Sequence, residues 1–365
     1  MFSQSDLRLI AFYLPQYHPI PENDEWWGKG FTDWRNVAKA KPLFRGHPQP
    51  HLPGELGSYD LRDSGARAAQ AALAREHGIS GFCYYHYWFN GKRLLERPLQ
   101  EVLSSRQPDF PFCLCWANEN WTRAWDGRNQ EVIIEQTYSH EDDRAHIRTL
   151  VPAFVDDRYI RIRGKPLFLI YRAEDLPEPA RTAAIWREEA QRAGLGEIFL
   201  VRVESFAGGV DPRSIGFDAA IEFAPQWRSA RKLRRERNPY RLFAKMGLFE
   251  DAYRKHRVIR YQSLVDHMLA EEFPNYPFFR CVTPRFDNSP RRSEGAAIFL
   301  DATPELYENW LAEVVRRTCE RYLGDEQIVF INAWNEWAEG NHLEPDERQG
   351  RAYLEATRRV ITKWS

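Results

Sequence analysis

Short apolar runs alternate with amphipathic stretches along almost the whole chain. The apolar runs are rich in β-branched and aromatic residues and have the length of buried strands. The stretches between them have helical periodicity, and the alanine-rich one at 62–77 follows a possible capping residue, Asp60. This alternation predicts a parallel α/β architecture. The predicted strands are 9–13, 81–87, 112–116, 167–171, 198–203, 219–223, 278–283 and 328–333, and the clearest helical stretches are 62–77, 177–193, 304–322 and 349–363.

About eight strand–helix units are the number expected for a (β/α)8 TIM barrel. The alternative is a doubly wound open sheet, which usually has a Gly-rich turn after its first strand. Here the first strand runs instead into Leu-Pro-Gln-Tyr-His-Pro at 14–19. Polar and aromatic residues follow most of the strands, as the catalytic face of a barrel predicts. We therefore expect a single (β/α)8 domain over residues 1–365.

Two segments are too long for a minimal barrel. The first βα loop, 22–57, is rich in Trp, Pro and His. Residues 226–262 form a basic insertion after the sixth strand, expected to be partly helical. Loops of this length are usually functional or disordered. The insertion is either a solvated basic face or a site for an anionic glycan, a nucleotide-sugar phosphate or a lipid headgroup.

Composition narrows the class of partner. The net charge of -1 implies no nucleic acid or other polyelectrolyte. No apolar stretch approaches the roughly 20 residues of a membrane helix, and the first residues do not resemble a secretory signal. The five cysteines lack zinc-site spacing, which favours buried free thiols in a cytoplasmic protein without metal or cofactor. Aromatic residues make up 14% of the chain, which fits either a large core or an aromatic-lined sugar cleft.

The strongest chemical signal follows the last predicted strand. Glu336 and Glu339 lie three residues apart among Trp334, Asn335 and Trp337. A helical turn would bring two such carboxylates to the same side, with Cβ atoms about 5–6 Å apart. Repulsion in a partly buried cleft would keep one of them protonated, which suits acid–base chemistry at a glycosidic bond. The alternative is a pair of surface acids at a helix N-terminus.

A second polar cluster follows the third predicted strand. Amide, carboxylate and indole side chains there suit sugar hydroxyls and ring faces, and Glu119 is a candidate third catalytic carboxylate. The alternative is a network that orders the loop. The predicted substrate-binding residues of this cluster are Asn118, Glu119, Trp121, Trp125 and Asp126.

The second strand and the first loop add further candidates. Alternation in the second strand sends Tyr85 and Tyr87 to one face and His86 and Trp88 to the other. His86 and Trp88 are predicted to bind substrate, although a histidine satisfied within the core is the competing interpretation. The first loop resembles a lid or subsite wall through Trp26, Trp27, Asp33 and Trp34. The remaining predicted substrate-binding residues are Tyr13, Trp34, Arg285 and Asn335.

Five ordered segments together resemble a known family. They are Phe-Tyr-Leu-Pro-Gln-Tyr-His at 12–18, Gly-Phe-Thr-Asp-Trp at 30–34, Tyr-Tyr-His-Tyr-Trp-Phe at 84–89, Cys-Trp-Ala-Asn-Glu-Asn-Trp at 115–121 and Trp-Asn-Glu-Trp-Ala-Glu-Gly at 334–340. They look like the WbsX-like family, also called glycoside hydrolase family 99-like, which is usually tied to bacterial O-antigen and other polysaccharide loci. The resemblance spans nearly the full chain.

The resemblance implies a (β/α)8 barrel that acts on glycosidic bonds. Family 99 proper contains retaining endo-α-mannosidases and mannanases with a Glu-Trp-His-Glu-Gly motif, which matches residues 336–340 here. By that match Glu336 is the base and Glu339 the general acid. The base deprotonates the sugar's own 2-hydroxyl, which displaces the leaving group and gives a 1,2-anhydro sugar. This chemistry requires manno-configured sugars such as α-mannose or α-rhamnose. The histidine of the motif is Ala338 here, so mannose specificity does not carry over.

Three functions remain open from the sequence. The first is a hydrolase or transglycosylase of an oligo- or polysaccharide, which could be a lipid-linked glycan. The second is a glycosyltransferase that uses an activated sugar donor, although no DxD-type metal motif or phosphate loop is present. The third is a non-catalytic glycan-binding barrel.

Overall fold

The computed structural model describes residues 6–123, 128–227 and 243–364. Eight parallel strands in it close into a barrel in the order β1, β2, β4, β8, β9, β10, β12 and β14, with β14 pairing back onto β1. Their bounds are Arg8–Tyr13, Gly81–Phe89, Phe112–Trp116, Lys165–Ile170, Phe199–Glu204, Ala219–Glu222, Phe278–Val282 and Ile328–Ile331. The predicted TIM barrel is therefore confirmed.

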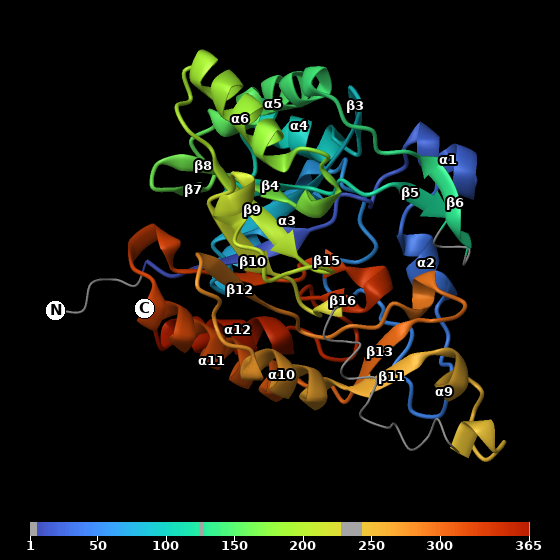
Figure 1. The fold of residues 1–365 in the computed structure, drawn as a ribbon. Coiled ribbons are helices and arrows are strands. Elements are labelled where there is room, and N and C mark those ends of the chain that lie inside the picture. Colours follow the sequence, from blue (N-terminus) through green and yellow to red (C-terminus); the bar gives the residue numbers. More distant parts are fainter. Residues whose placement is uncertain (1–5, 124–127, 228–242, 365) are drawn as a thin grey trace.

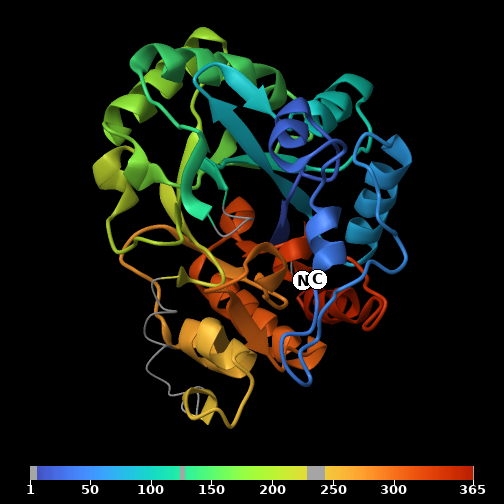
Figure 2. The same ribbon diagram turned by 90° about the vertical axis from the view of Figure 1, so that its right-hand side faces the viewer.

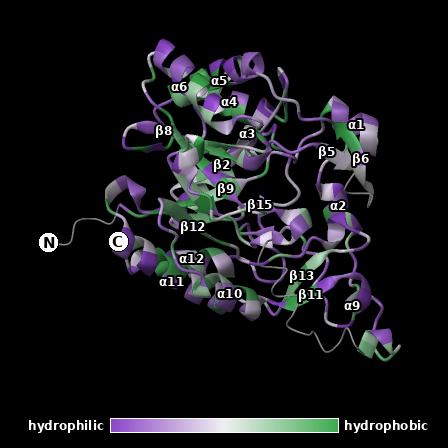
Figure 3. Ribbon diagram, viewed as in Figure 1, coloured by the Kyte–Doolittle hydropathy of each residue, from purple (hydrophilic) through white to green (hydrophobic). Residues whose placement is uncertain are grey.

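Helices surround the barrel strands (Figures 1 and 2). They are α3 (Ser64–Glu76), α4 (Arg97–Ser105), α5 (His140–Phe154), α6 (Pro179–Arg192), α10 (Tyr261–Ala270), α11 (Pro304–Arg321) and α12 (Ala352–Thr362). Side-chain caps start several of them: the carboxylate of Asp63 accepts from the Gly65 amide and the hydroxyl of Thr303 from the Leu306 amide. Hydrophobic residues gather on the central strands, and the outer turns of α5 and α6 are hydrophilic (Figure 3). The core thus lies inside the barrel and between barrel and helices.

Extra elements gather at one end of the barrel, on the right in Figure 1 and facing the viewer in Figure 2. Helices α1 (Pro21–Trp27) and α2 (Trp34–Lys39) come from the long first loop. Strands β5 (Trp121–Arg123) and β6 (Arg128–Ile134) form a hairpin after β4. Strand β3 (Lys92–Leu94) pairs antiparallel with the end of β2. Short β7 (Arg161–Ile162) pairs with the first residues of β8 and lies at the other end of the barrel, on the left in Figure 1. Barrel strands carry catalytic groups at their carboxyl ends, so α1, α2 and the β5–β6 hairpin surround the place where a site is expected.

The predicted basic insertion falls between β10 and α10. Residues 228–242, which hold most of its arginines, lie outside the described residues. The described remainder contains α9 (Ala252–Lys255) and β11 (Arg257–Arg260), and β11 pairs in parallel with β13 (Ala297–Leu300). Phe44, Tyr253, Val258 and Ile298 form a small hydrophobic cluster there, separate from the barrel core. The insertion is thereby packed against the first loop.

Candidate active site

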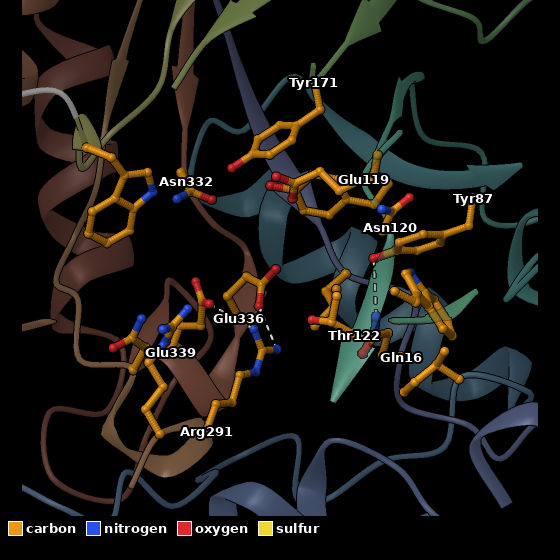
Figure 4. A pocket seen from close by; sticks show the side chains of 18 of the residues that line it. Gln16, Tyr87, Glu119, Asn120, Thr122, Tyr171, Arg291, Asn332, Glu336 and Glu339 are labelled. Atoms are coloured by element: carbon orange, nitrogen blue, oxygen red, sulfur yellow. Dashed lines mark hydrogen bonds and ion pairs between the residues drawn. The ribbon is translucent and has the colours of Figure 1, made fainter. Parts of the chain in front are cut away.

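A cavity of about 730 Å³ opens at the carboxyl ends of the barrel strands. Side chains from many separate segments along the chain line it, so it exists only in the closed barrel. Figure 4 shows Glu119 and Tyr171 on one side of this cavity and Arg291 with Glu336 and Glu339 on another. The principal lining residues are Gln16, Trp26, Trp27, Tyr85, Tyr87, Glu119, Asn120, Trp121, Tyr171, Trp227, Arg257, Arg291, Asn332, Glu336 and Glu339.

Glu336 and Glu339 meet at one guanidinium. Glu336 ends the short strand β15 (Asn335–Glu336), and Glu339 ends the 3-10 turn η6 (Trp337–Glu339). Positions three apart lie on one side of such a turn. Arg291 Nη2 lies 3.0 Å from Glu336 Oε2, and Arg291 Nη1 lies 2.9 Å from Glu339 Oε1. The expected convergence of the two carboxylates is therefore present.

A third carboxylate shares the same cation. Asp33, from the first loop, is fully buried, and its Oδ2 lies 2.6 Å from Arg291 Nη2. Its other oxygen accepts a hydrogen bond from the Asn36 side chain at 2.9 Å. Three acids around one guanidinium would carry a net charge of about -2 if all were ionised, which is costly away from water. The cluster therefore favours keeping one proton.

Electrostatics point to Glu336 as the residue that holds this proton. Burial raises the pKa of the Glu336 carboxyl to about 8, and the charges of Glu339 and Asp33 add to the shift while Arg291 opposes it. Because the two glutamates interact closely, protons leave the pair in linked steps. A pair with one protonated and one ionised member can donate a proton at one oxygen and accept one at another.

Glu119 is a third acid of the cavity. Its side chain is 45% exposed, but the exposure is into the cavity, where surrounding protein raises the pKa of this carboxyl to about 7. Arg172 Nη1, 3.3 Å away, opposes that rise, and the charge of Glu339 contributes to it. The ionisation of Glu119 therefore depends in part on the charge of Glu339 in the same cavity.

Indole rings form much of the cavity wall, but they are not those next to the glutamates. Trp334 and Trp337 are completely or almost completely buried and support the turn from behind. Trp337 donates its indole N–H to Glu344 at 2.6 Å and stacks on His342. The lining indoles belong to Trp26, Trp27, Trp121 and Trp227. The tryptophans that neighbour the glutamates in sequence are therefore not the ones that face the cavity.

Several predicted substrate-binding residues point away from the cavity, under the surrounding helices. Tyr13 donates its hydroxyl to Gln70 of α3 at 2.7 Å. His86 lies 2.9 Å from His146 of α5, and Trp88 donates to Asp142 of the same helix at 3.0 Å. None of the three lines the cavity. The opposite face of β2, with Tyr85 and Tyr87, does line it, so the predicted alternation is right and the choice of face was wrong.

Three further predicted residues have structural partners instead. The Trp34 indole donates to the Tyr59 carbonyl at 2.7 Å. Both polar atoms of the Asn118 amide bond the backbone of Arg172, at 2.7 and 2.8 Å. Asn335 pairs in the same way with the backbone of Leu14, at 2.7 and 3.0 Å.

The last predicted residues divide between two cavities and the undescribed part of the chain. Glu119 and Trp121 line the cavity described above. Arg285 lies in a second cavity instead. Trp125 and Asp126 lie outside the described residues.

Some lining residues have little signal in the sequence. Arg291 sits in a 3-10 turn, η4 (Ser289–Arg291), far along the chain from both glutamates. Trp227 and Arg257 line the cavity from the two ends of the basic insertion. Gln16 Oε1 and Asn332 Oδ1 are buried acceptors with no hydrogen-bond partner among the described residues. The only sequence signal for these two was their place just after a strand.

A family model described as "Glycosyltransferase WbsX" matches residues 9–357. The chain belongs to the WbsX glycosyltransferase family. Two curated relatives, both named WxcX and both from Xanthomonas campestris pv. campestris strains, are 46% identical to this WbsX-family chain over 355 residues. The match covers 97% of the chain but 50% of each relative, so the chain spans about half the length of the curated relatives it matches.

Solved structures with a similar fold are glycoside hydrolases or resemble them. A family 99 endo-α-mannosidase from Bacteroides thetaiotaomicron superposes with a TM-score of 0.60 at 15% identity, covering 99% of this chain and 98% of that chain. A glycoside hydrolase-like protein superposes with a TM-score of 0.56 at 13% identity, covering 99% and 96%. At such identities the likeness establishes the fold of this WbsX-family member. None of its described helices has the length and apolar character needed to cross a membrane.

Proposed function

We propose that this protein cleaves or transfers α-linked, manno-configured sugars of the mannose or rhamnose type in bacterial polysaccharide metabolism, such as that of an O-antigen. The observation that carries the proposal is the Glu336–Arg291–Glu339 arrangement inside a cavity with indole walls. Two carboxylates that differ in protonation are what the making or breaking of a glycosidic bond requires. The cavity volume, about 730 Å³, suits a short stretch of oligosaccharide.

Unpaired polar atoms in the wall also fit a sugar ligand. Gln16 Oε1 and Asn332 Oδ1 are buried acceptors without hydrogen-bond partners among the described residues. A buried acceptor without a partner costs free energy, and a sugar hydroxyl would supply the missing donor. Trp26, Trp27 and Trp121 provide flat apolar faces for sugar rings.

The proposed chemistry follows the match to the family 99 motif. Glu336 as carboxylate accepts the proton of the sugar 2-hydroxyl, and the 2-oxygen attacks the anomeric carbon. The bond to the leaving oxygen breaks as Glu339 donates its proton there, which gives a 1,2-anhydro sugar. Glu339, now a carboxylate, takes a proton from water or an acceptor hydroxyl that attacks the anomeric carbon, and Glu336 returns its proton to the 2-oxygen. The reactive form of the singly protonated pair has its proton on Glu339 rather than on Glu336, and the high pKa of Glu336 makes its carboxylate a strong base in that form.

Ala338 bears on substrate choice. It occupies the place of the family 99 histidine and is completely buried, outside the cavity lining. The contact made by that histidine would have to come from another residue here. We therefore leave open which manno-configured sugar is the substrate, and propose both mannose- and rhamnose-based glycans for testing.

The test is turnover by two carboxamide variants. Glu339→Gln and Glu336→Gln should each lower oligosaccharide release from α-mannans or α-rhamnans by about 10²–10⁴-fold, because each removes one proton-transfer group. Glu347→Gln, an exposed glutamate outside the cavity, is the matched control and should retain full activity. Wild-type turnover in Glu339→Gln would refute the assignment. Glycan binding without turnover by the wild-type protein would instead favour a non-catalytic barrel.

A second function, transfer from an activated sugar donor, is favoured by one observation, the arginine-lined cavity described next. Saturable binding of a nucleoside diphosphate, together with incorporation of sugar from a nucleotide-sugar donor, would favour it over hydrolysis.

A further inference from the structure

A second cavity, of about 630 Å³, lies between the first loop, the described part of the insertion and β13. The elements around it, α9, β11 and β13, lie together to one side of the barrel in Figures 1 and 2. Its lining combines arginines with an apolar wall, whereas the first cavity combines acids with indoles. This difference in chemistry indicates a different ligand.

Four arginines line the second cavity: Arg45, Arg260, Arg285 and Arg348. Neither Arg260 nor Arg348 has a carboxylate partner among the described residues, although most other described arginines form ion pairs. Two carboxylates, Asp287 and Asp301, also line the cavity, and Asp346 balances Arg285, so the net charge at the cavity is about +1. Guanidinium groups without acidic partners facing a cavity attract an anion.

Asp287 forms no ion pair with these arginines, because both of its oxygens are engaged elsewhere. Its Oδ2 contacts His47 Nε2 at 2.8 Å and Gln49 Nε2 at 2.6 Å. Its Oδ1 accepts from the Ser289 amide at 2.9 Å. The positive charge of the cavity is therefore available to a ligand.

Arg285 gives the cavity a fixed guanidinium group whose charge Asp346 balances. It is 7% exposed, its Nη1 lies 2.7 Å from Asp346, and its guanidinium stacks over the Tyr353 ring at 4.5 Å. Its Nε is buried and has no hydrogen-bond partner in the described part of the chain. A side chain held in this way needs little ordering when it binds. Arg285 was predicted from the sequence to bind sugar, but its place in the second cavity indicates that it binds the ligand of that cavity.

We propose that the second cavity binds the phosphate group of a phosphorylated organic molecule. Planar guanidinium groups match phosphate oxygens in pairs, and Arg260 and Arg348 line the cavity without a carboxylate partner among the described residues. The organic part of the ligand lies against Phe44, Tyr253, Val258 and Ile298, which form the apolar wall. Such a phosphate could belong to a nucleoside diphosphate or to a lipid carrier, and the chemistry at the arginines is shared.

The site adjoins the proposed catalytic turn through one segment of backbone. The Asp287 amide donates to the Glu339 carbonyl at 2.6 Å, and Gly340 lines the second cavity. A side chain at position 340 would lie about 3.2 Å from Asp287, so the two segments pack closely. A phosphorylated ligand therefore binds directly behind the backbone of Glu339, on the far side from the glycan.

Calorimetric titration of the full chain tests this with three probes: inorganic phosphate, a nucleoside diphosphate and a short-chain prenyl phosphate. The Arg260→Ala/Arg348→Ala double variant should weaken binding of the tightest probe by at least about tenfold, since it removes two charge-assisted contacts. Both arginines are exposed, so the two substitutions should not affect folding. Arg358→Ala, exposed and outside both cavities, is the matched control and should bind as the wild type does.

The order of affinities identifies the source of the phosphate. Tighter binding of the nucleoside diphosphate supports a nucleotide-sugar, and tighter binding of the prenyl phosphate supports a lipid-linked glycan. Equal affinities support a site for the phosphate group alone. Absence of saturable binding for all three probes, or equal binding by the double variant and the wild type, overturns the proposal. Glu336→Gln should bind the probes normally, so this result is independent of the proposed catalytic role.

Discussion

The single positive charge of Arg291 pairs with three carboxylates, those of Asp33, Glu336 and Glu339. Removal of this charge should change the proton affinity of Glu336. The substitution Arg291→Gln deletes the cation that lies 3.0 Å from Glu336 Oε2. Arg291→Lys is the matched control, because it keeps a positive charge while losing the planar group that reaches all three acids. The first variant should raise the pKa of Glu336 strongly, and the second should raise it less.

The size of the shift follows from Coulomb's law. Two unit charges about 4 Å apart attract with ~4 kcal/mol at an effective dielectric constant of about 20. That energy corresponds to ~3 pKa units at 1.36 kcal/mol per unit. Rearrangement of Glu339 and Asp33 after loss of the cation reduces this, so we expect a rise of about one to three units above the present value near 8.

The assay is the pH dependence of kcat/KM together with a ¹³C NMR titration of glutamate carboxyl groups. The wild type should lose activity as pH rises through about 8, because the glutamate pair then loses the one proton that must reach the leaving oxygen. In Arg291→Gln this fall should move to higher pH, and the Glu336 resonance, assigned with Glu336→Gln, should move with it. A midpoint that stays near 8 or falls would show that Arg291 does not control Glu336.

Three other predictions concern stability and binding. Burial raises the Glu336 pKa from its ordinary value of 4.5 to about 8 in the folded state, so wild-type stability falls as pH rises through this interval. Glu336→Gln should therefore be more stable than the wild type at pH 8, by on the order of 2 kcal/mol, and show little gain at pH 4, as thermal unfolding would measure. Trp121→Ala should weaken glycan binding by ~1–3 kcal/mol, because the indole that lines the cavity loses its contact with the sugar ring. The unfolding temperature should change little, and an unchanged affinity in a binding titration would contradict the prediction. Asn118→Ala should instead lower stability by about 1–3 kcal/mol through the lost bonds to Arg172, and normal denaturant resistance would refute that structural role.

The barrel was predictable because its signal is local. Each predicted strand overlaps an observed one, since a strand buried on both faces must be a short apolar run whatever its neighbours are. The sequence signal for the two carboxylates was local as well, because Glu336 and Glu339 lie three residues apart along one 3-10 turn.

Which residues line the cavity depends on contacts between segments that are far apart in the sequence. The sequence shows that the two faces of β2 differ, but it does not show which one turns inward, and His86 and Trp88 face α5. Asn118 and Asn335 looked like sugar ligands because amides suit hydroxyl groups, yet the same amides match peptide backbones equally well. Arg291 could not be found from spacing, because it reaches Glu336 only through the closed barrel.

The pairing of β1 with β14 has a consequence for biosynthesis. The proposed acid and base follow the last barrel strand, and the Asp33 that shares their cation follows the first. A nascent chain therefore lacks a competent catalytic centre until the last barrel strand has been synthesised. Two complementary fragments, divided at an exposed loop, would each be inert and would recover turnover only on reassociation.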